Sequence, residues 1–244
     1  MPKLHHIEYG NMSLADCQEQ ESLSKAEPAF YRDAASYWSQ VPATVDGVLG
    51  GYGHVSSVDV QGSERFLRAI SQRPERLLKE RALDCGAGVG RVTKEFLKDH
   101  FKIVDLVEQD FHFLEAAKTD LSATGHKGRF FCQGLQNFQP EEGYYDVIWS
   151  QWVLGHLIDA DLVKFFERCK IGLRPKGYLV IKENVTASGE VEMDHTDSSV
   201  TRPLKSLIDL VKKAGYQLVH QQKQQRFPKD LYQVYMLAFK PNKP

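Results

Sequence analysis

The stretch ALDCGAGVGRVTKEF, residues 82–96, passes from a short apolar run through three closely spaced glycines into an amphipathic pattern. This order predicts a strand, a tight turn and a helix. Gly86, Gly88 and Gly90 fall in the turn, where missing side chains let a ligand approach the backbone. The stretch therefore predicts a nucleotide-type cofactor site at the end of a buried strand.

Short apolar runs alternate with amphipathic stretches on both sides of this turn. We predict five strands, most of them followed by a helix, at residues 81–86, 102–108, 129–134, 144–154 and 177–184. The runs 216–225 and 231–240 are separated only by RFPKD and predict an antiparallel pair at one edge. The fold class is α/β: a Rossmann-like, mostly parallel sheet of seven strands with helices on both faces.

The region before residue 81 has a different organisation. Residues 1–28 are polar without apolar periodicity and predict a flexible tail, whereas 29–42 and 63–78 predict amphipathic helices. Between these helices lies TVDGVLGGYGHVSS, residues 44–57, which is a second glycine-rich stretch. We predict one domain over 29–240, with a helical cap at 29–80 and a Rossmann-like core at 81–240.

Composition excludes several function classes. The 31 basic and 32 acidic residues give a net charge of −1, which exerts no overall attraction on nucleic acid or an anionic membrane. No apolar run is long enough to span a bilayer. The four cysteines form no CxxC pair, which predicts free thiols and neither a zinc ribbon nor a disulfide framework: Cys17, Cys85, Cys132 and Cys169. We expect a protein of the cytoplasm and nucleus without a metal.

The turn at residues 86–90 is compared with three kinds of nucleotide site. A phosphate-binding P-loop would end in Gly-Lys-Ser/Thr, which is missing, and a dinucleotide site would prefer G-x-G-x-x-G over the G-x-G-x-G spacing found here. Asp84, two residues before the first glycine, would repel a pyrophosphate. A carboxylate there suits a cofactor with positive charge and no phosphate, which describes S-adenosylmethionine.

Residues after the turn fit the same cofactor. Arg91 lies in the first helical turn, where the helix dipole disfavours a cation by about 0.3 to 1 kcal/mol unless an anion accompanies it. The methionyl carboxylate would be that anion. Glu108 ends the second strand, 24 positions after Asp84, and is expected to bind the ribose hydroxyls. Further contacts are expected at the ends of the third and fourth strands: Leu135 and Gln136 near the adenine, and Gln151 near the methionyl end.

Several segments resemble one known family. YWSQVPATVDGVLGGYGHVSSVD (37–59), ALDCGAGVGRVTK (82–94), YDVIWSQWVLGHL (145–157), LRPKGYLVIKEN (173–184) and DSSVTR (197–202) are similar to the protein alpha-N-terminal methyltransferases. The resemblance runs from about Phe30 to Lys240. It implies a class I fold dependent on S-adenosylmethionine, with S-adenosylhomocysteine as product. It also implies methylation of the free α-amine of partner proteins that begin Ala/Pro/Ser-Pro-Lys/Arg after loss of the initiator methionine.

The motifs and the resemblance together predict the site residues. The cofactor-binding set is Asp84, Gly86, Gly88, Arg91, Glu108, Gln109, Asp110, Leu135, Gln136 and Gln151. The substrate-binding set is Trp38, Leu49, Gly50, Trp152, Asn184, Asp194, Asp197 and Tyr232, and the catalytic set is Asp197, His156 and Asn184. The family pattern has Asp where this chain has Glu108, so the ribose contact must accommodate an extra methylene.

Each predicted role has a structural alternative. Asp197 or His156 would accept the proton of the substrate amine, although a histidine in this position can also be structural. Asn184, at the end of the fifth strand, would hold the first substrate residues. Asp194 and Asp197, three apart, would attract the Lys or Arg at substrate position three, or would both be solvated.

Flat aromatic side chains are also expected at the substrate. Trp38, Trp152 and Tyr232 would pack against the substrate proline, although Tyr232 could equally belong to the core. Trp149, in the middle of the fourth strand, is assigned to the core. Under the resemblance, Leu49 and Gly50 would belong to a mobile cover over the extended peptide end. The alternative is a flexible connection between two helices.

Two other functions remain open from the sequence. A small-molecule N- or O-methyltransferase would share the cofactor fold, because a fold does not fix its function. A cofactor-binding or partner-binding module without activity would keep the glycine turn. The glycine-rich stretch and the pair of acidic residues favour the peptide substrate.

Overall fold

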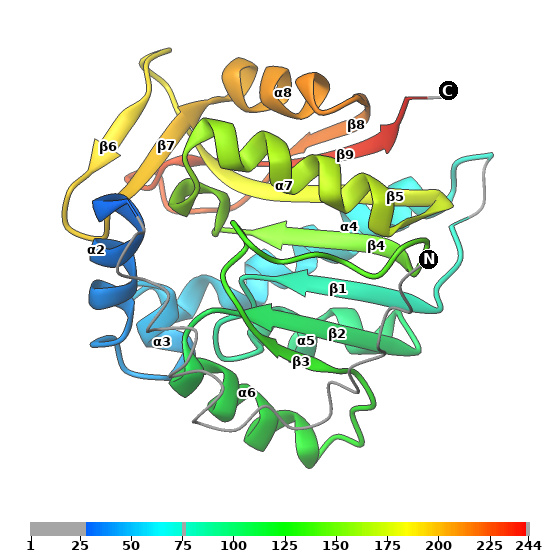
Figure 1. The fold of residues 1–244 in the computed structure, drawn as a ribbon, viewed down its shortest axis with the longest axis horizontal. Helices are drawn as coiled ribbons and strands as arrows, with labels where there is room; N and C mark the ends of the chain where they lie inside the picture. Colours follow the sequence, from blue (N-terminus) through cyan, green and yellow to red (C-terminus); the bar gives the residue numbers. More distant parts are fainter. Residues whose placement is uncertain (1–27, 75–76, 243–244) are drawn as a thin grey trace, which may run out of the picture.

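The computed structural model describes residues 28–74 and 77–242, and a mixed sheet runs through its centre (Figure 1). The strands are β1 (Arg81–Cys85), β2 (Ile103–Glu108), β3 (Phe130–Cys132), β4 (Tyr145–Gln151), β5 (Leu173–Thr186), β6 (Glu192–Asp194), β7 (Ser199–Pro203), β8 (Tyr216–Lys223) and β9 (Gln233–Pro241). Their order is β3-β2-β1-β4-β5-β7-β6, while β9 pairs antiparallel with both β5 and β8. The α/β class and the antiparallel pair β8–β9 are confirmed.

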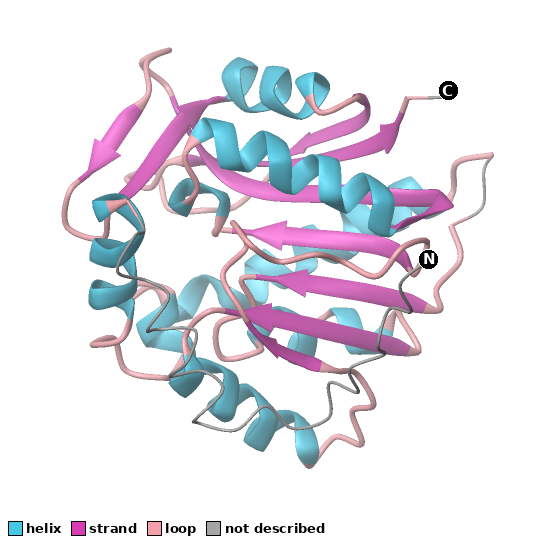
Figure 2. Ribbon diagram, viewed as in Figure 1, coloured by secondary structure: helices cyan, strands magenta, loops and turns pink. Residues whose placement is uncertain are grey.

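Helices cover both faces of the sheet (Figure 2). The helices are α2 (Ala29–Trp38), α3 (Val45–Val48), α4 (Ser56–Ser71), α5 (Arg91–Glu95), α6 (Phe111–Ser122), α7 (Asp159–Gly172) and α8 (Leu204–Lys213). Side chains of neighbouring strand residues point to opposite faces and therefore pack into separate cores. Leu83 and Ile148 pack in the core with Phe165 of α7, whereas Ala82 and Trp149 pack in the core with α4 and α5.

Trp149 is fully buried, which confirms its assignment to the core. The indole N–H of Trp149 is satisfied within the core, where it donates to Gln151 Oε1 at 3.1 Å. Strand β4 therefore places Trp149 in the core and ends two residues later at Gln151, which is a predicted cofactor residue.

The structure differs from the predicted elements in strand number and in several boundaries: α2 ends at Trp38, β4 ends at Gln151 and β5 spans Leu173–Thr186. The sheet has two strands more than the seven expected, because β6 and β7 form a short hairpin after β5. Helix α4 begins at Ser56, before the expected start at residue 63, and α5 ends at Glu95, followed by a 3₁₀ turn at Leu97–Asp99. The segments of β6 and β7 each contain one apolar residue besides proline, Met193 and Val200, so no apolar run marks them in the sequence. The predicted tail, residues 1–28, lies outside the described residues except for Pro28.

The glycine-rich stretch is an ordered turn between α2 and α4. Thr44 caps α3 by accepting a hydrogen bond from Gly47 N, and Asp46 Oδ1 accepts one from Gly53 N at 2.9 Å. Gly50 and Gly51 have φ angles of +59° and +85°, which other residues adopt only at a cost. These contacts bring α3 to the end of the sheet toward which the arrows of β1, β2 and β4 point (Figure 1).

Within the described part of the chain, no helix is both long and apolar enough to cross a membrane.

Candidate active site

Two cavities adjoin beyond the carboxyl ends of the parallel strands. The first cavity is lined by the glycine turn, Glu108 and Gln151, and the second by Asn184, Asp197 and residues near the start of β9. Five residues line both cavities: Trp38, Val48, Leu49, Trp152 and His156. A group bound in the first cavity can therefore meet a group bound in the second at these five side chains.

The glycine turn forms one wall of the first cavity. Gly86 and Gly88 have φ angles of +66° and +55°, and both line this cavity. A Cβ at Gly86 would lie 2.3 Å from Cγ2 of Val153, so no larger residue fits without displacing the segment after β4. The turn is thus shaped both by backbone conformation and by the close approach of Val153.

Glu108 lies at the end of β2 with its carboxylate held by the backbone. Oε2 accepts a hydrogen bond from Gly88 N at 2.8 Å, and Oε1 accepts one from Asp110 N at 2.9 Å. Burial raises the pKa of Glu108 to about 7 despite these two donors. Because each carboxylate oxygen has a second lone pair, Glu108 can still accept hydrogen bonds from two hydroxyl groups in the first cavity.

Arg91 lines the first cavity but already has an anion. Arg91 Nη1 donates to Asp59 Oδ2 at 2.8 Å and to Ser56 Oγ at 3.2 Å, and both partners come from α4. Asp59 thus supplies an anion that the sequence did not indicate, and the predicted contact of Arg91 with the methionyl carboxylate stays a prediction. Gln151 is engaged by the same carboxylate, because its Nε2 lies 3.0 Å and 2.9 Å from the two oxygens of Asp59.

Gln109, Leu135 and Gln136 also line the first cavity, as the sequence predicts. Asp84 and Asp110 do not. Asp84 is 1% exposed and accepts a hydrogen bond from Thr93 Oγ1 at 2.7 Å, while burial raises its pKa to about 6. Asp110 is the N-cap of α6 and accepts from Phe113 N. Asp84 therefore lies behind the cavity wall, and Asp110 lies at the N-terminal end of α6.

His156 is held in one tautomer at the junction of the cavities. Trp38 Nε1 donates to His156 Nε2 at 3.1 Å, and because an indole N–H can only donate, Nε2 carries no proton. The other nitrogen, Nδ1, lies 3.4 Å from Ser198 O and carries the hydrogen. Burial lowers the pKa of His156, although Asp197 and the Ser198 carbonyl oppose this effect. In neutral His156, the lone pair of Nε2 therefore already accepts a hydrogen bond from Trp38.

Asp197 lines the second cavity beside His156. One oxygen, Oδ1, accepts a hydrogen bond from Ser199 Oγ at 2.6 Å, and the other lies 4.0 Å from His156 Nε2. Asp197 and Asn184 both line the second cavity. Asp197 belongs to the turn of the β6–β7 hairpin. The sequence predicted Asp197 as a site residue but did not predict the hairpin that positions it.

The remaining predicted substrate residues are divided. Gly50 and Tyr232 line the second cavity, and the Tyr232 hydroxyl donates to Glu192 Oε2 at 2.6 Å. Asp194 does not line the second cavity, because it ends β6 on the surface and accepts a hydrogen bond from Thr196 N. The two acids three residues apart therefore face different surroundings, as the bend at the hairpin turn separates them.

Glu183 is a residue of the second cavity that sequence reasoning missed. Its Oε1 accepts hydrogen bonds from Val153 N and Leu154 N, both at 2.8 Å. Burial raises the pKa of Glu183 to about 7. The two donors follow Trp152, which has a φ of +52°, unusual for a bulky residue. Glu183 thus helps to hold Trp152 in a strained conformation between the cavities.

Other lining residues were missed for lack of a local signal. Phe227 and Leu231 belong to the connection between β8 and β9 and line the second cavity. Phe113, in the first turn of α6, lines the first cavity and lies 6.3 Å from Trp38 between ring centroids. The position of Phe113, five residues after the end of the second strand, could have indicated it. Among residues 28–74 and 77–242, no cluster of three or more His, Cys, Asp or Glu side chains could hold a metal ion.

Comparisons with known proteins identify the family of the chain. A family profile described as AdoMet dependent proline di-methyltransferase matches residues 26–240. The chain belongs to this family. This methyltransferase is 51% identical to alpha N-terminal protein methyltransferase 1 of Drosophila melanogaster over 223 residues, covering 90% of the chain and 79% of the relative. It is 47% identical to N-terminal Xaa-Pro-Lys N-methyltransferase 1-B of Xenopus laevis, covering 89% and 98%.

A solved structure gives the same result. A SAM-dependent methyltransferase of Leishmania major matches with a TM-score of 0.82 at 36% identity, covering 92% of this chain and 91% of that chain. The methyltransferase uses S-adenosylmethionine as its cofactor. The first cavity offers groups that fit this cofactor: a buried carboxylate for hydroxyl groups, a guanidinium for a carboxylate, and a glycine turn without side chains.

Proposed function

We propose that this methyltransferase transfers methyl groups to the free α-amine of proteins that begin Ala/Pro/Ser-Pro-Lys/Arg. The observation that carries the proposal is the junction of two cavities at Trp38, Trp152 and His156, with Asp197 beside it. The names of the relatives support an Xaa-Pro-Lys substrate. An extended peptide N-terminus would fit the second cavity, because this cavity meets the first at only five shared side chains.

The first cavity would hold the cofactor by three contacts. Glu108 accepts hydrogen bonds from the ribose hydroxyls, and Arg91 donates to the methionyl carboxylate. Leu135 and Gln136 lie against the adenine. S-Adenosylmethionine supplies an electrophilic methyl group, and these residues fix the direction in which that group points.

The second cavity would hold the peptide. Trp38 and Trp152 provide flat faces on which the substrate proline packs. Asn184 binds the first peptide unit, and Asp197 provides the negative charge inside the cavity for the residue at position three. Tyr232, at 44% exposure, lies at the outer part of this cavity, and Asp194 attracts a basic side chain from the surface.

Proton removal is the main chemical task of the protein side chains. A free α-amine has a pKa of about 7.7 to 8.0, so a modest bias yields the neutral nucleophile. Asp197 accepts this proton, because it lines the second cavity while the Nε2 lone pair of His156 accepts from Trp38. His156 accepts the hydrogen bond from Trp38 and keeps that indole in place. Alignment of the neutral amine with the methyl group then permits an in-line displacement.

The test uses labelled S-adenosylmethionine and a Ser-Pro-Lys peptide, with the N-acetylated peptide as the matched control. We expect the free peptide to be labelled and the acetylated one to remain unlabelled, because acetylation removes the nucleophile. A Ser-Pro-Glu peptide should be labelled more slowly, since Asp197 repels its third residue. Labelling of the acetylated peptide, or of none of the peptides, would contradict the proposal.

A further inference from the structure

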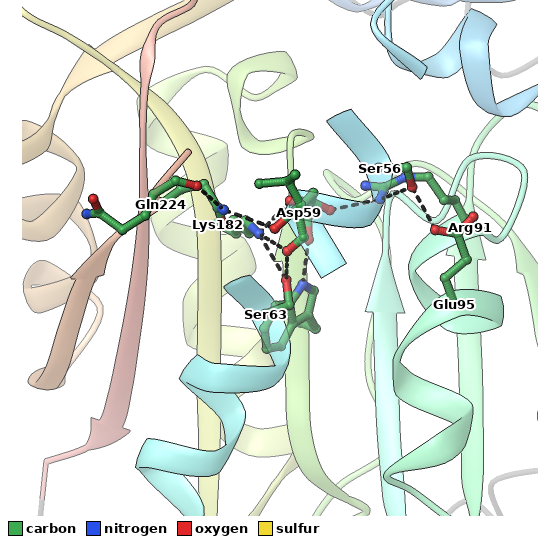
Figure 3. Close-up of polar contacts among 11 residues, drawn as sticks. Ser56, Asp59, Ser63, Arg91, Glu95, Lys182 and Gln224 are labelled. Carbon is green, nitrogen blue, oxygen red and sulfur yellow. Dashed lines mark hydrogen bonds and ion pairs between the residues drawn. The ribbon is translucent and has the colours of Figure 1, made fainter. Parts of the chain in front are cut away.

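A buried ionic cluster lies behind the first cavity, centred on Asp59 of α4 (Figure 3). Asp59 is 1% exposed and contacts Arg91 of α5 at 2.8 Å and Lys182 of β5 at 2.5 Å. The same carboxylate accepts from Gln151 Nε2 at the end of β4. One side chain of α4 therefore joins helix α5 to strands β4 and β5.

The contacts of Asp59 with two cationic side chains favour its ionised form. Burial by itself would raise the pKa of Asp59, but Lys182 and Arg91 together hold that pKa below its usual value. Burial lowers the pKa of Lys182 to about 8 against the opposing effect of Asp59. A buried ion pair is a poor source of stability, because desolvation offsets much of the attraction. The cluster therefore calls for an explanation other than stability.

Two members of the cluster line the first cavity and two do not. Arg91 and Gln151 line it, whereas Asp59 and Lys182 are absent from its wall. Asp59 and Ser56 both engage Nη1 of Arg91. In the part of the chain that the structure describes, Nε and Nη2 of Arg91 make no hydrogen bond, although the side chain is only 5% exposed. The guanidinium is thus anchored on one side and has free donors on the other.

We propose that Asp59 is a positioning residue for the methionyl end of the cofactor. By holding Arg91 through Nη1 and Gln151 through Nε2, Asp59 orients both side chains before the cofactor arrives. The two remaining nitrogens of Arg91 are then available for a bidentate contact with the cofactor carboxylate. Preorganisation of this kind raises affinity because less side-chain freedom is lost on binding. The proposal rests on the proposed contact between Arg91 and that carboxylate.

The test compares two ligands that differ only at the methionyl end. S-Adenosylhomocysteine carries the amino-acid carboxylate, whereas 5′-methylthioadenosine lacks it. For Asp59→Asn, isothermal titration calorimetry should show a Kd for S-adenosylhomocysteine about tenfold higher or more, with the Kd for 5′-methylthioadenosine changed by less than about twofold. A purely structural role of Asp59 would weaken both ligands equally.

Two further variants separate this effect from folding. Asp59→Asn leaves Lys182 buried without an anion, so Asp59→Asn/Lys182→Met removes that charge as well. The double variant should show the same selective loss. Lys182→Met alone is the matched control: it disturbs the cluster but leaves Asp59 on Arg91, and its Kd for S-adenosylhomocysteine should change by less than about twofold. Thermal melts of all variants report whether each is folded.

Three outcomes would overturn the proposal. They are an unchanged Kd for S-adenosylhomocysteine in both Asp59 variants, an equal loss for the two ligands, and a selective loss in Lys182→Met as large as in Asp59→Asn. Arg91→Gln identifies which step fails. If Arg91→Gln shows no selective loss, the contact between Arg91 and the carboxylate is wrong. If Arg91→Gln shows the selective loss but the Asp59 variants do not, the contact between Arg91 and the carboxylate stands and the positioning role of Asp59 is wrong.

Discussion

At the scale of single residues, the bond between Trp38 and His156 separates two candidates for the proton acceptor. Trp38 Nε1 donates to His156 Nε2 at 3.1 Å, so accepting a proton there requires this bond to break. Asp197 has no such obstacle, because the oxygen that lies 4.0 Å from His156 can turn to a substrate amine. The sequence predicted both residues and could not rank them, since the ranking depends on a contact from a helix 118 positions away.

Asp197→Asn should lower kcat by about 10² to 10⁴, because the proton acceptor is lost while the shape of the side chain is kept. Affinity for S-adenosylmethionine should change little, since Asp197 lines only the second cavity. His156→Gln is the matched comparison, as its side-chain oxygen can still accept from Trp38. Steady-state kinetics and calorimetry measure both effects. A larger loss of kcat in His156→Gln than in Asp197→Asn would reverse the assignment.

Cofactor affinity should depend on pH through Glu108. Burial raises the pKa of Glu108 to about 7 in the free protein. Donation from two ribose hydroxyls favours the ionised form, so binding lowers this pKa and releases a proton. Affinity should therefore rise as the pH rises toward about 7 and level off above it.

Calorimetry in buffers of different ionisation enthalpy should detect this proton release just below pH 7. In Glu108→Gln the release and the pH dependence should both disappear. A pH dependence that persists unchanged in Glu108→Gln would exclude Glu108 as the titrating group at the ribose.

At the scale of elements, the glycine-rich turn and the β6–β7 hairpin bring substrate residues to the sheet. The turn at residues 44–57 is held by Thr44 and Asp46, and it presents Leu49 and Gly50 to the second cavity. The hairpin, which lies beyond β5 in the sheet, presents Asp197 to the same cavity. Glycine content indicated the turn in advance, whereas a hairpin of short strands left no pattern.

Gly50→Val should raise the KM for the peptide by about three- to tenfold and leave the affinity for S-adenosylmethionine unchanged. Gly50 lines the second cavity, and a side chain there would occupy space beside the peptide. Gly51→Val is the matched control, because both glycines have positive φ and open surroundings but only Gly50 lines the cavity. Each variant should lose about 1 to 2 kcal/mol of stability from the left-handed backbone. Equal peptide KM values for the two variants would make the turn a simple connection.

At the scale of the whole molecule, the active site is a junction between two cavities built from distant segments. Helix α2 contributes Trp38, the end of β4 leads to Trp152, and the loop after it contributes His156. Because parallel strands end at one edge of the sheet, residues that follow different strands meet there. This rule allowed Glu108, Gln151 and Asn184 to be predicted at one site from their positions alone.

The sequence by itself determined the alternation of strands and helices, the glycine turn at residues 86–90, and the antiparallel pair at the sheet edge. Each of these is a local pattern of side-chain polarity or backbone freedom, and such patterns are visible along the chain. Tertiary structure alone decided that Asp59 is the anion of Arg91, that Trp38 occupies the lone pair of His156, and that Asp84 lies behind the cavity wall. Those three outcomes depend on how the elements pack against one another. Packing decides which polar atoms are buried and toward which partner they point.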